Sequence, residues 1–360
     1  MSNFALSENG NPYTMNLKTN SKLLICILSG LLIIGCHKKE KPEKAFYYWK
    51  TVFHLSASQE KFLGDLGVSK IYIRFFDVDV NSVSGQLEPR AKIHFKEVVP
   101  ASYEIVPVVY ITNKSFLISN PAEIPDFAAN VLNLVNDMAA NNKIKYKEIQ
   151  IDCDWTDNSK TKYFSFLKAI KFRLAKNKQL LSATIRLHQI KYKTQTGIPP
   201  VDKGMLMYYN MGKITPDETS NSIYNTNDAA KYVDYCKEYP LPFDVVLPVF
   251  SWGIHVRKNK IVELINNMKQ ADLDNNTNFL KINAVSFIAL QSFFLDGNYY
   301  MKDDIVRIEG VTPTDCLEAA QQLKNNLIKP IKTIAIFHLD SLITNHYETK
   351  DFEKIFNTFN

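Results

Sequence analysis

The sequence predicts an α/β protein built as a single (β/α)8 TIM-like barrel, and two observations lead to this prediction. From residue 45 onward, short runs rich in Val, Ile, Tyr and Phe alternate with longer segments of helical period, which is the pattern of repeated β-α units. The chain has 360 residues, and barrels of this kind often occupy about 250 residues as one domain.

Eight apolar runs are expected to form the barrel strands. In chain order they cover residues 45–49, 70–76, 104–111, 148–154, 181–187, 205–210, 244–251 and 333–339. One helix is expected to begin after Ser56 or Ser58 and to continue to Leu66, with Gly67 ending it. Further helices are expected over 125–140, around 164–170 and over 228–239. Eight strands in this order predict a closed barrel.

Two connections depart from a regular barrel. Residues 191–203 contain Gly197 and two prolines and are expected to form a loop. The long connection between the seventh and eighth runs contains a turn at residues 296–298 between two aromatic segments, which predicts a β-hairpin insertion. Such an insertion lies on the ligand-binding face of a barrel and could cover a ligand, but a small packing appendage explains it equally well.

The first residues have the pattern of a lipoprotein signal peptide. Two lysines precede a largely apolar run from Leu23 to Ile34, and the run ends at Gly35 and Cys36. The run is too short to span a membrane, which takes about 20 residues, and the small Gly35 suits a cleavage site. We expect residues 1–35 to be removed and Cys36 to carry lipid such as palmitate. The lipid would anchor the protein to a membrane of the bacterial cell envelope.

Residues 36–44 are charged and are expected to form a flexible tether, so the folded domain is expected to span residues 45–360. Met15 is an alternative start that leaves a signal peptide of ordinary length. The chain has 43 Lys and Arg against 37 Asp and Glu, a net charge of +6 to which the tether contributes. This near balance predicts no nucleic-acid partner.

The usual signatures of several enzyme classes are absent after Cys36. The sequence has no GxGxxG, GxxxxGK, GxSxG or HExxH motif there. Three cysteines follow Cys36 without CxxC spacing, which argues against a disulfide framework or a zinc site. We expect no cofactor and no metal, because Asp152, Asp154 and His188 have only the spacing of neighbouring strands.

Polar residues at the ends of the apolar runs are the candidates for a site, because barrels of this type bind ligands there. The fourth run places Gln150, Asp152 and Asp154 at alternating positions, so all three are expected to face the barrel axis. Two carboxylates so close should raise the proton affinity of one, which makes Asp152 and Asp154 candidates for a catalytic acid and base. The alternative is a buried structural pair satisfied by arginine or backbone donors.

Other runs contribute candidate binding residues. Arg186 on the fifth run is the natural counter-ion of the two acids, and Trp252 after the seventh run could stack on a pyranose ring or cap the core. His338 by itself is more often a packing residue than a catalyst. The remaining binding candidates are Arg74, Asp77, Asp79, Trp155, Gln189, Tyr208, Asn210 and Asp340.

Two short motifs resemble those of family 18 glycoside hydrolases, the chitinase type. Residues 152–155, Asp-Cys-Asp-Trp, resemble part of the strand-four signature D-x-x-D-x-D-x-E, and residues 207–210, Met-Tyr-Tyr-Asn, resemble M-x-Y-D on strand six. The resemblance implies a TIM barrel that acts on an oligosaccharide or polysaccharide. Residues 74–79 and 150–156 also resemble an uncharacterised group of bacterial lipoproteins, which has no established activity.

The sequence also departs from the family pattern. Ile149 stands at the first Asp position, Thr156 at the catalytic Glu position and Asn210 at the strand-six Asp position. A threonine cannot donate the proton that glycosidic cleavage requires. Either another acid performs this role or the protein binds a glycan without cutting it.

Three hypotheses therefore stay open: an envelope glycoside hydrolase, a glycan-binding lipoprotein without catalysis, and an envelope interaction protein whose polar cluster is a buried ion network. Open carboxylates in a groove favour the first two, and a sealed Asp–Arg cluster favours the third. A second protonatable carboxyl across the cleft, from Asp77, Asp79 or Asp340, would distinguish an enzyme from a binding protein.

Overall fold

The computed structural model describes residues 41–216, 220–327, 329–340, 343 and 347–360. The predicted signal peptide, Cys36 and the first part of the tether lie outside these residues, whereas the last tether residues, Glu43 and Lys44, lie in the first strand. Within the described part of the chain, no helix is long and apolar enough to cross a membrane.

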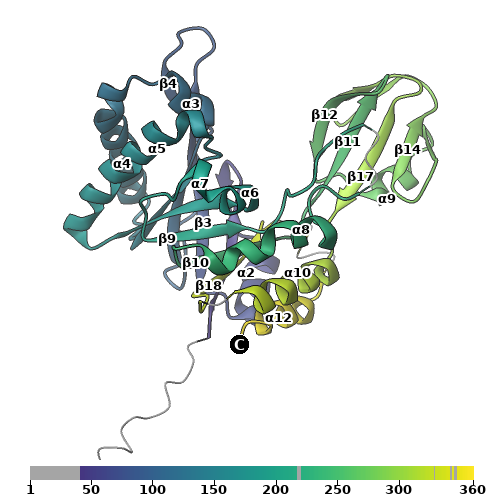
Figure 1. Ribbon diagram of the computed structural model, residues 1–360. Helices are drawn as coiled ribbons and strands as arrows, with labels where there is room; N and C mark the ends of the chain where they lie inside the picture. Colours follow the sequence, from purple (N-terminus) through teal and green to yellow (C-terminus); the bar gives the residue numbers. More distant parts are fainter. Residues whose placement is uncertain (1–40, 217–219, 328, 341–342, 344–346) are drawn as a thin grey trace, which may run out of the picture. The chain divides into compact units, whose positions relative to one another are not determined.

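Eight parallel strands form the closed barrel that the sequence predicts (Figure 1). They are β1 (Glu43–Tyr48), β3 (Lys70–Val80), β6 (Glu104–Ile111), β7 (Glu148–Asp152), β8 (Leu180–Arg186), β9 (Lys203–Met207), β10 (Phe243–Pro248) and β18 (Thr333–Phe337). Strand β1 pairs with β18 on one side and with β3 on the other, and the second pairing closes the barrel. Strand β4 (Leu87–Arg90) pairs antiparallel with the last residues of β3. Strand β2 (Val52–Phe53) pairs in parallel with β5 (His94–Phe95) in a separate small sheet.

Helices lie between the barrel strands, and their apolar faces share one core with the strands. They are α2 (Ala57–Leu66), α3 (Asn113–Ile118), α4 (Ile124–Asn141), α5 (Asp157–Leu174), α6 (Leu187–Lys191), α7 (Lys193–Thr196), α8 (Thr226–Val233), α10 (Pro313–Asn326) and α12 (Thr349–Asn357). The predicted ends of α2 are confirmed. The Ser56 side chain accepts a hydrogen bond from the Gln59 backbone, and Gly67 ends the helix at a φ of 66°.

Several strands end before the position predicted for them. Strands β7, β9 and β10 end at Asp152, Met207 and Pro248. Each end lies two or three residues before the end of the predicted run. The remaining residues of each run leave the ladder to form the loops at the barrel mouth. Asn210 shows the reason locally, because its positive φ of 53° is incompatible with an extended strand.

The connection between β10 and β18 is larger than the predicted hairpin. It contains a five-stranded sheet in the order β12 (Lys260–Asn266), β11 (Ser251–Arg257), β17 (Ile305–Gly310), β14 (Ser286–Ala289) and β13 (Phe279–Lys281), with the short helix α9 (Gln270–Asp274). The predicted hairpin is present as β15 (Phe293–Leu295) and β16 (Asn298–Tyr300). This insertion has its own apolar cluster around Leu273, Phe287 and Tyr300.

Charged side chains are paired inside the barrel at the end where the strands begin. Lys203 Nζ lies 2.8 Å from Glu148 Oε2 and 2.5 Å from Asp244 Oδ2, which joins β7, β9 and β10. Glu148 and Asp244 are only 2% and 1% exposed. Ser182 on β8 donates a further hydrogen bond of 2.6 Å to Glu148. Two buried carboxylates of this layer therefore share one cation from β9.

Replacing Lys203 tests this interior layer. Lys203→Met is expected to lower the free energy of unfolding by about 3–5 kcal/mol, because it leaves buried carboxylates without their cation. Chemical denaturation measures the loss. Lys147→Met is the control, since Lys147 is 83% exposed and lies 3.5 Å from Glu104, and its loss should change stability little. Equal effects of the two substitutions would contradict the assignment.

Candidate functional site

A cavity of about 560 Å³, here called the mouth cavity, opens at the C-terminal ends of the barrel strands. Strand β3, the ends of β7 and β8, and the segments after β1, β9, β10 and β18 contribute to it. Seven of the residues predicted from the sequence line this cavity: Arg74, Asp77, Asp152, Asp154, Arg186, Asn210 and Trp252. The structure therefore brings together the acids, their arginine and one indole from separate parts of the chain.

Asp152 is the deepest carboxyl of the mouth cavity. It is 7% exposed, and its Oδ1 accepts a hydrogen bond of 2.6 Å from Thr184 Oγ1 on β8. Burial, followed by the nearby charge of Asp154, raises the pKa of Asp152 to about 7. The sequence predicted that one of the two acids would raise the proton affinity of the other. Asp152 therefore holds its proton to a higher pH than an ordinary aspartate does.

Asp154 is held by Arg186, the counter-ion predicted from the sequence. Arg186 Nε donates to Asp154 Oδ1, and Arg186 Nη2 donates to Oδ2 at 2.6 Å, so the pair is bidentate. Although burial disfavours the guanidinium charge, Asp154 raises the pKa of Arg186 above its ordinary value. The Arg186 guanidinium therefore stays charged in the cavity wall.

A second arginine–carboxylate pair lies on β3. Arg74 Nε is 2.8 Å from Asp77 Oδ1, and Arg74 Nη2 donates to Asp77 Oδ2 at 2.9 Å. The Arg74 guanidinium also lies 5.6 Å from the ring centre of Trp49. Burial raises the pKa of Asp77, and Arg74 opposes this shift. The mouth cavity therefore has an ion pair on β3 and another at the ends of β7 and β8.

Aromatic rings form much of the remaining lining, including Trp49, Tyr110, Tyr209, Phe250, Trp252 and Phe337. Tyr209 and Phe337 have ring centres 5.6 Å apart, and Phe250 meets Trp252 edge to face at 5.6 Å. Burial and the charge of Asp154 raise the pKa of Tyr110 to about 12, so its phenol stays neutral and can donate a hydrogen bond. Apart from Trp252, these rings were not among the residues predicted for the site.

Trp252 belongs to the insertion and not to a barrel strand, because it is the second residue of β11. Its indole nitrogen donates to Glu309 Oε2 at 3.2 Å. Glu309 is 4% exposed and also accepts a hydrogen bond from the Ser222 backbone at 3.0 Å. Arg307 pairs with the other oxygen of Glu309 at 3.1 Å. Glu309 is therefore a positioning residue that holds the indole against a loop of the barrel.

Three predicted residues lie away from the mouth cavity in buried positions. Tyr208 faces outward, where its hydroxyl donates to Gln322 on α10 at 2.8 Å, because successive side chains of an extended chain point to opposite sides. Trp155 is 1% exposed and donates to the Thr196 carbonyl at 2.9 Å. Gln189 is fully buried and bonds to the backbones of Arg186 and Trp155, so it ties the ends of β7 and β8 together.

Two further predicted acids also lie outside the mouth cavity. Asp79 accepts a hydrogen bond of 2.8 Å from Thr112 near the end of β6, and this bond lowers the pKa of Asp79. Asp340 lines a neighbouring cavity, whereas His338 lines both cavities. Within the described residues, no group of three His, Cys, Asp or Glu side chains could hold a metal ion.

No protein-family model and no curated protein sequence matches the chain. Its fold is similar to that of the spore cortex-lytic enzyme SleL of Bacillus cereus, with a TM-score of 0.53 and 14% identity over 90% of this chain and 75% of the other. A chitinase from Chromobacterium violaceum gives 0.51 and 10% identity over 88% and 98%. The chitinase-like agglutinin RobpsCRA of Robinia pseudoacacia gives 0.50 and 14% identity over 88% and 99%.

These comparisons establish a shared fold. The chain is a (β/α)8 barrel of the kind found in chitinase-like proteins, and proteins of this fold include a lytic enzyme, a chitinase and an agglutinin. Because enzymes and a binding protein share the barrel, the fold does not select between these activities. The arrangement of side chains at the mouth has to make that distinction.

The raised pKa of Asp152 predicts a specific dependence of stability on pH. A carboxyl that binds its proton more tightly in the folded state stabilises the fold below its unfolded pKa, and this contribution is lost as pH rises through about 7. Asp152→Asn stays neutral and keeps an acceptor for Thr184. Between pH 4 and 8 the free energy of unfolding should therefore fall less in the variant than in the wild type. The difference between the two falls should be up to about 4 kcal/mol.

Urea unfolding at several pH values across this range measures the difference. Asp157→Asn is the matched control, because Asp157 begins α5 and its side chain is 71% exposed. Its pH profile should run parallel to that of the wild type. A profile of Asp152→Asn that is also parallel to the wild type would show that Asp152 does not titrate in this window.

Proposed function

We propose that the protein binds a glycan in the mouth cavity without cleaving it. The observation that carries this proposal is the pairing of the cavity carboxyls. Among the described lining residues these are Asp77, Asp152 and Asp154. Asp77 and Asp154 each meet an arginine through two contacts, and Asp152 is 7% exposed beneath them.

Glycosidic cleavage requires a carboxyl group that can donate a proton to the oxygen of the scissile bond. A neighbouring arginine favours the charged form of a carboxyl and so opposes proton donation, although burial still raises the pKa of Asp77 above its ordinary value. Thr156, which stands at the glutamate position in the family resemblance, is the N-cap of α5, and its hydroxyl lies 3.4 Å from Asn113 Nδ2. An alcohol does not supply the missing acid. This arrangement supports binding over hydrolysis.

The lining is suited to a sugar. The indole of Trp49 and the wall around Trp252 offer apolar faces to the C–H side of a pyranose ring, while the paired arginines and the asparagines offer donors and acceptors to its hydroxyls. Asn210 Oδ1 is buried and has no hydrogen-bond partner among the described residues. A buried amide oxygen without a partner is costly, which favours rotation of this side chain toward a sugar hydroxyl when a ligand is bound.

Hydrolysis with Asp152 as the acid is a second candidate, and one observation favours it. The pKa of Asp152 is raised to about 7, the value that suits a general acid at neutral pH. The same carboxyl is 7% exposed and engaged by Thr184, which leaves little of it accessible to a glycosidic oxygen. We therefore place binding first and let the experiment test both.

The protein lacking residues 1–40, which keeps the whole folded unit, should be titrated with a panel of oligosaccharides that includes N-acetylglucosamine oligomers. Thermal stabilisation reports binding, and released reducing ends report hydrolysis. We expect stabilisation without release. Trp49→Ala should weaken binding by roughly tenfold or more, as expected for loss of a central aromatic contact. Tyr192→Ala is the control, because Tyr192 is a 47% exposed aromatic residue outside the cavity.

Two outcomes would overturn the proposal. Sugar release that is abolished by Asp152→Asn would make the protein a hydrolase with Asp152 as its acid. A lack of stabilisation by every glycan would contradict both sugar-based functions and favour the third hypothesis, a buried ion network without a small ligand.

We also propose that the mature protein is a lipoprotein of the bacterial cell envelope. The apolar run before Gly35 and Cys36 and the charged segment after them support this. The full-length chain expressed in a bacterium should partition into detergent, and the mass of its N-terminal peptide should show acyl chains on Cys36. Cys36→Ala should abolish both properties. A soluble protein with an intact N-terminus would contradict the proposal.

A further inference from the structure

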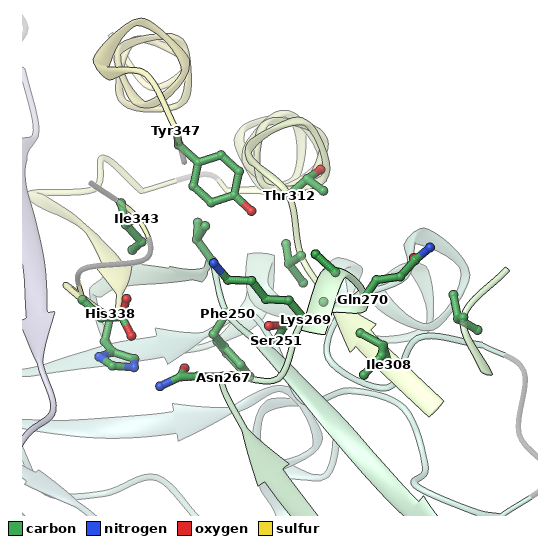
Figure 2. Close-up of a pocket in the computed structure, with 16 residues that line it drawn as sticks. Phe250, Ser251, Asn267, Lys269, Gln270, Ile308, Thr312, His338, Ile343 and Tyr347 are labelled. Carbon is green, nitrogen blue, oxygen red and sulfur yellow. The ribbon is translucent and has the colours of Figure 1, made fainter. Parts of the chain in front are cut away.

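A second cavity of about 560 Å³, here called the side cavity, is shown in Figure 2. Phe250, Ser251, Asn267 and His338 line both this cavity and the mouth cavity. The rest of the side cavity comes from the insertion, the start of α10 and the segment after β18. The side cavity and the mouth cavity are therefore neighbours that meet at these four side chains.

The side cavity is mainly apolar but contains one lysine. Its apolar lining includes Val249, Ile308, Val311 and Ile343. Lys269 lies just before α9 and is half-buried, and Figure 2 shows its side chain extending into the cavity. No ion pair of Lys269 is present in the part of the chain that the structure describes.

The charges of the two cavities differ in how they are balanced. Both arginines of the mouth cavity are paired with carboxylates, whereas Lys50 in the same cavity has no ion pair within the described ranges. Asp340 also lines the side cavity and has an interaction partner, so the described lining of the two cavities has four cations and four carboxylates. What the side cavity offers a ligand is Lys269, a cation without an ion pair among the described residues.

We propose that the side cavity binds a carboxyalkyl group carried by the glycan. The carboxylate lies at Lys269, the alkyl part lies against the apolar wall, and a neighbouring sugar of the same chain occupies the mouth cavity. This inference rests on the proposed function, since it names the class of glycan that the site takes. The ligand is thus an acidic oligosaccharide whose charge is on a short side arm.

Two alternatives fit the side cavity less well. A plain pyranose ring would place several hydroxyls against an apolar wall with too few partners, which is unfavourable. A purely hydrocarbon group would bury the Lys269 ammonium without a counter-ion. A carboxylate on a short alkyl arm satisfies the cation and the apolar wall together.

The experiment uses three tetrasaccharides of N-acetylglucosamine: one unsubstituted, one with lactyl ethers on alternate sugars as free carboxylates, and one with the same ethers as methyl esters. Calorimetry measures their affinities for the folded unit. The wild type should bind the acid roughly tenfold more tightly than the ester, which corresponds to about 1.4 kcal/mol. Added salt should reduce this preference.

Three variants isolate the role of Lys269. Lys269→Met keeps the length of the side chain but removes its charge, so it should bind acid and ester equally. Lys269→Arg should keep the preference for the acid. Lys260→Met is the matched control, because Lys260 is exposed on β12 of the same insertion and lies outside both cavities. Binding of the unsubstituted tetrasaccharide by Lys269→Met shows that this variant is folded.

The outcomes separate this inference from the proposed function. Equal affinity of the wild type for acid and ester, or an unchanged preference in Lys269→Met, overturns the role of the side cavity. If the unsubstituted tetrasaccharide still binds, and Trp49→Ala still weakens it, glycan binding at the mouth stands while this inference fails. If no tetrasaccharide binds, the inference falls together with the glycan-binding proposal.

Discussion

A polar side chain that points into a closed barrel is cut off from water, so it needs a partner on a neighbouring strand. This constraint acts at successive levels of the barrel. Lys203 joins three strands at the end where they begin. Thr184 meets Asp152 further along β8, and Arg186 meets Asp154 at the mouth. Each pair fixes the position of one strand against the next, and the candidate site is the last level of this series.

The same pairing that positions the acids also determines their chemistry. Arg186 is paired with Asp154, and burial, followed by the nearby charge of Asp154, raises the pKa of Asp152. The mouth therefore combines charged pairs with one carboxyl that titrates near neutrality. A catalytic site would expose such a carboxyl to its substrate, whereas here Thr184 and the surrounding rings cover most of it. This is the physical basis for placing binding before hydrolysis.

Local patterns in the sequence predicted the barrel and part of its mouth. The apolar run at residues 104–111 matches β6 at both ends, and the alternation at Gln150, Asp152 and Asp154 correctly indicated acids at the mouth with Arg186 beside them. These features depend on neighbours along one strand or on adjacent strands. Side chains also alternate at the adjacent Tyr208 and Tyr209. Tyr208, the predicted binding residue, faces outward, whereas Tyr209 lines the cavity.

The insertion sheet and the bond between Trp252 and Glu309 could not be predicted in the same way. Strand β12 has three exposed apolar residues, Ile261, Val262 and Leu264, and lacks a continuous buried face. Trp252 and Glu309 are 57 positions apart in the sequence and meet only because β11 and β17 pair in a particular register. Contacts of this kind follow from tertiary packing, and no local spacing indicates them.

Glu309 has a consequence for the way the molecule unfolds. The insertion has a second apolar cluster, whereas Trp252, Ile254 and Val256 of its strand β11 pack in the main core. A separate cluster allows that part of the insertion to open while the barrel stays folded. Glu309 joins the insertion to the barrel, since it holds Trp252 and Arg307 of the insertion against Ser222 of the barrel. A molecule bound between Trp252 and the barrel acids would contact the insertion and the barrel at once. A ligand bound in the mouth cavity would then make the barrel and the insertion unfold as a single cooperative unit. Unfolding would depend on ligand binding, and ligand binding would depend on both parts being folded.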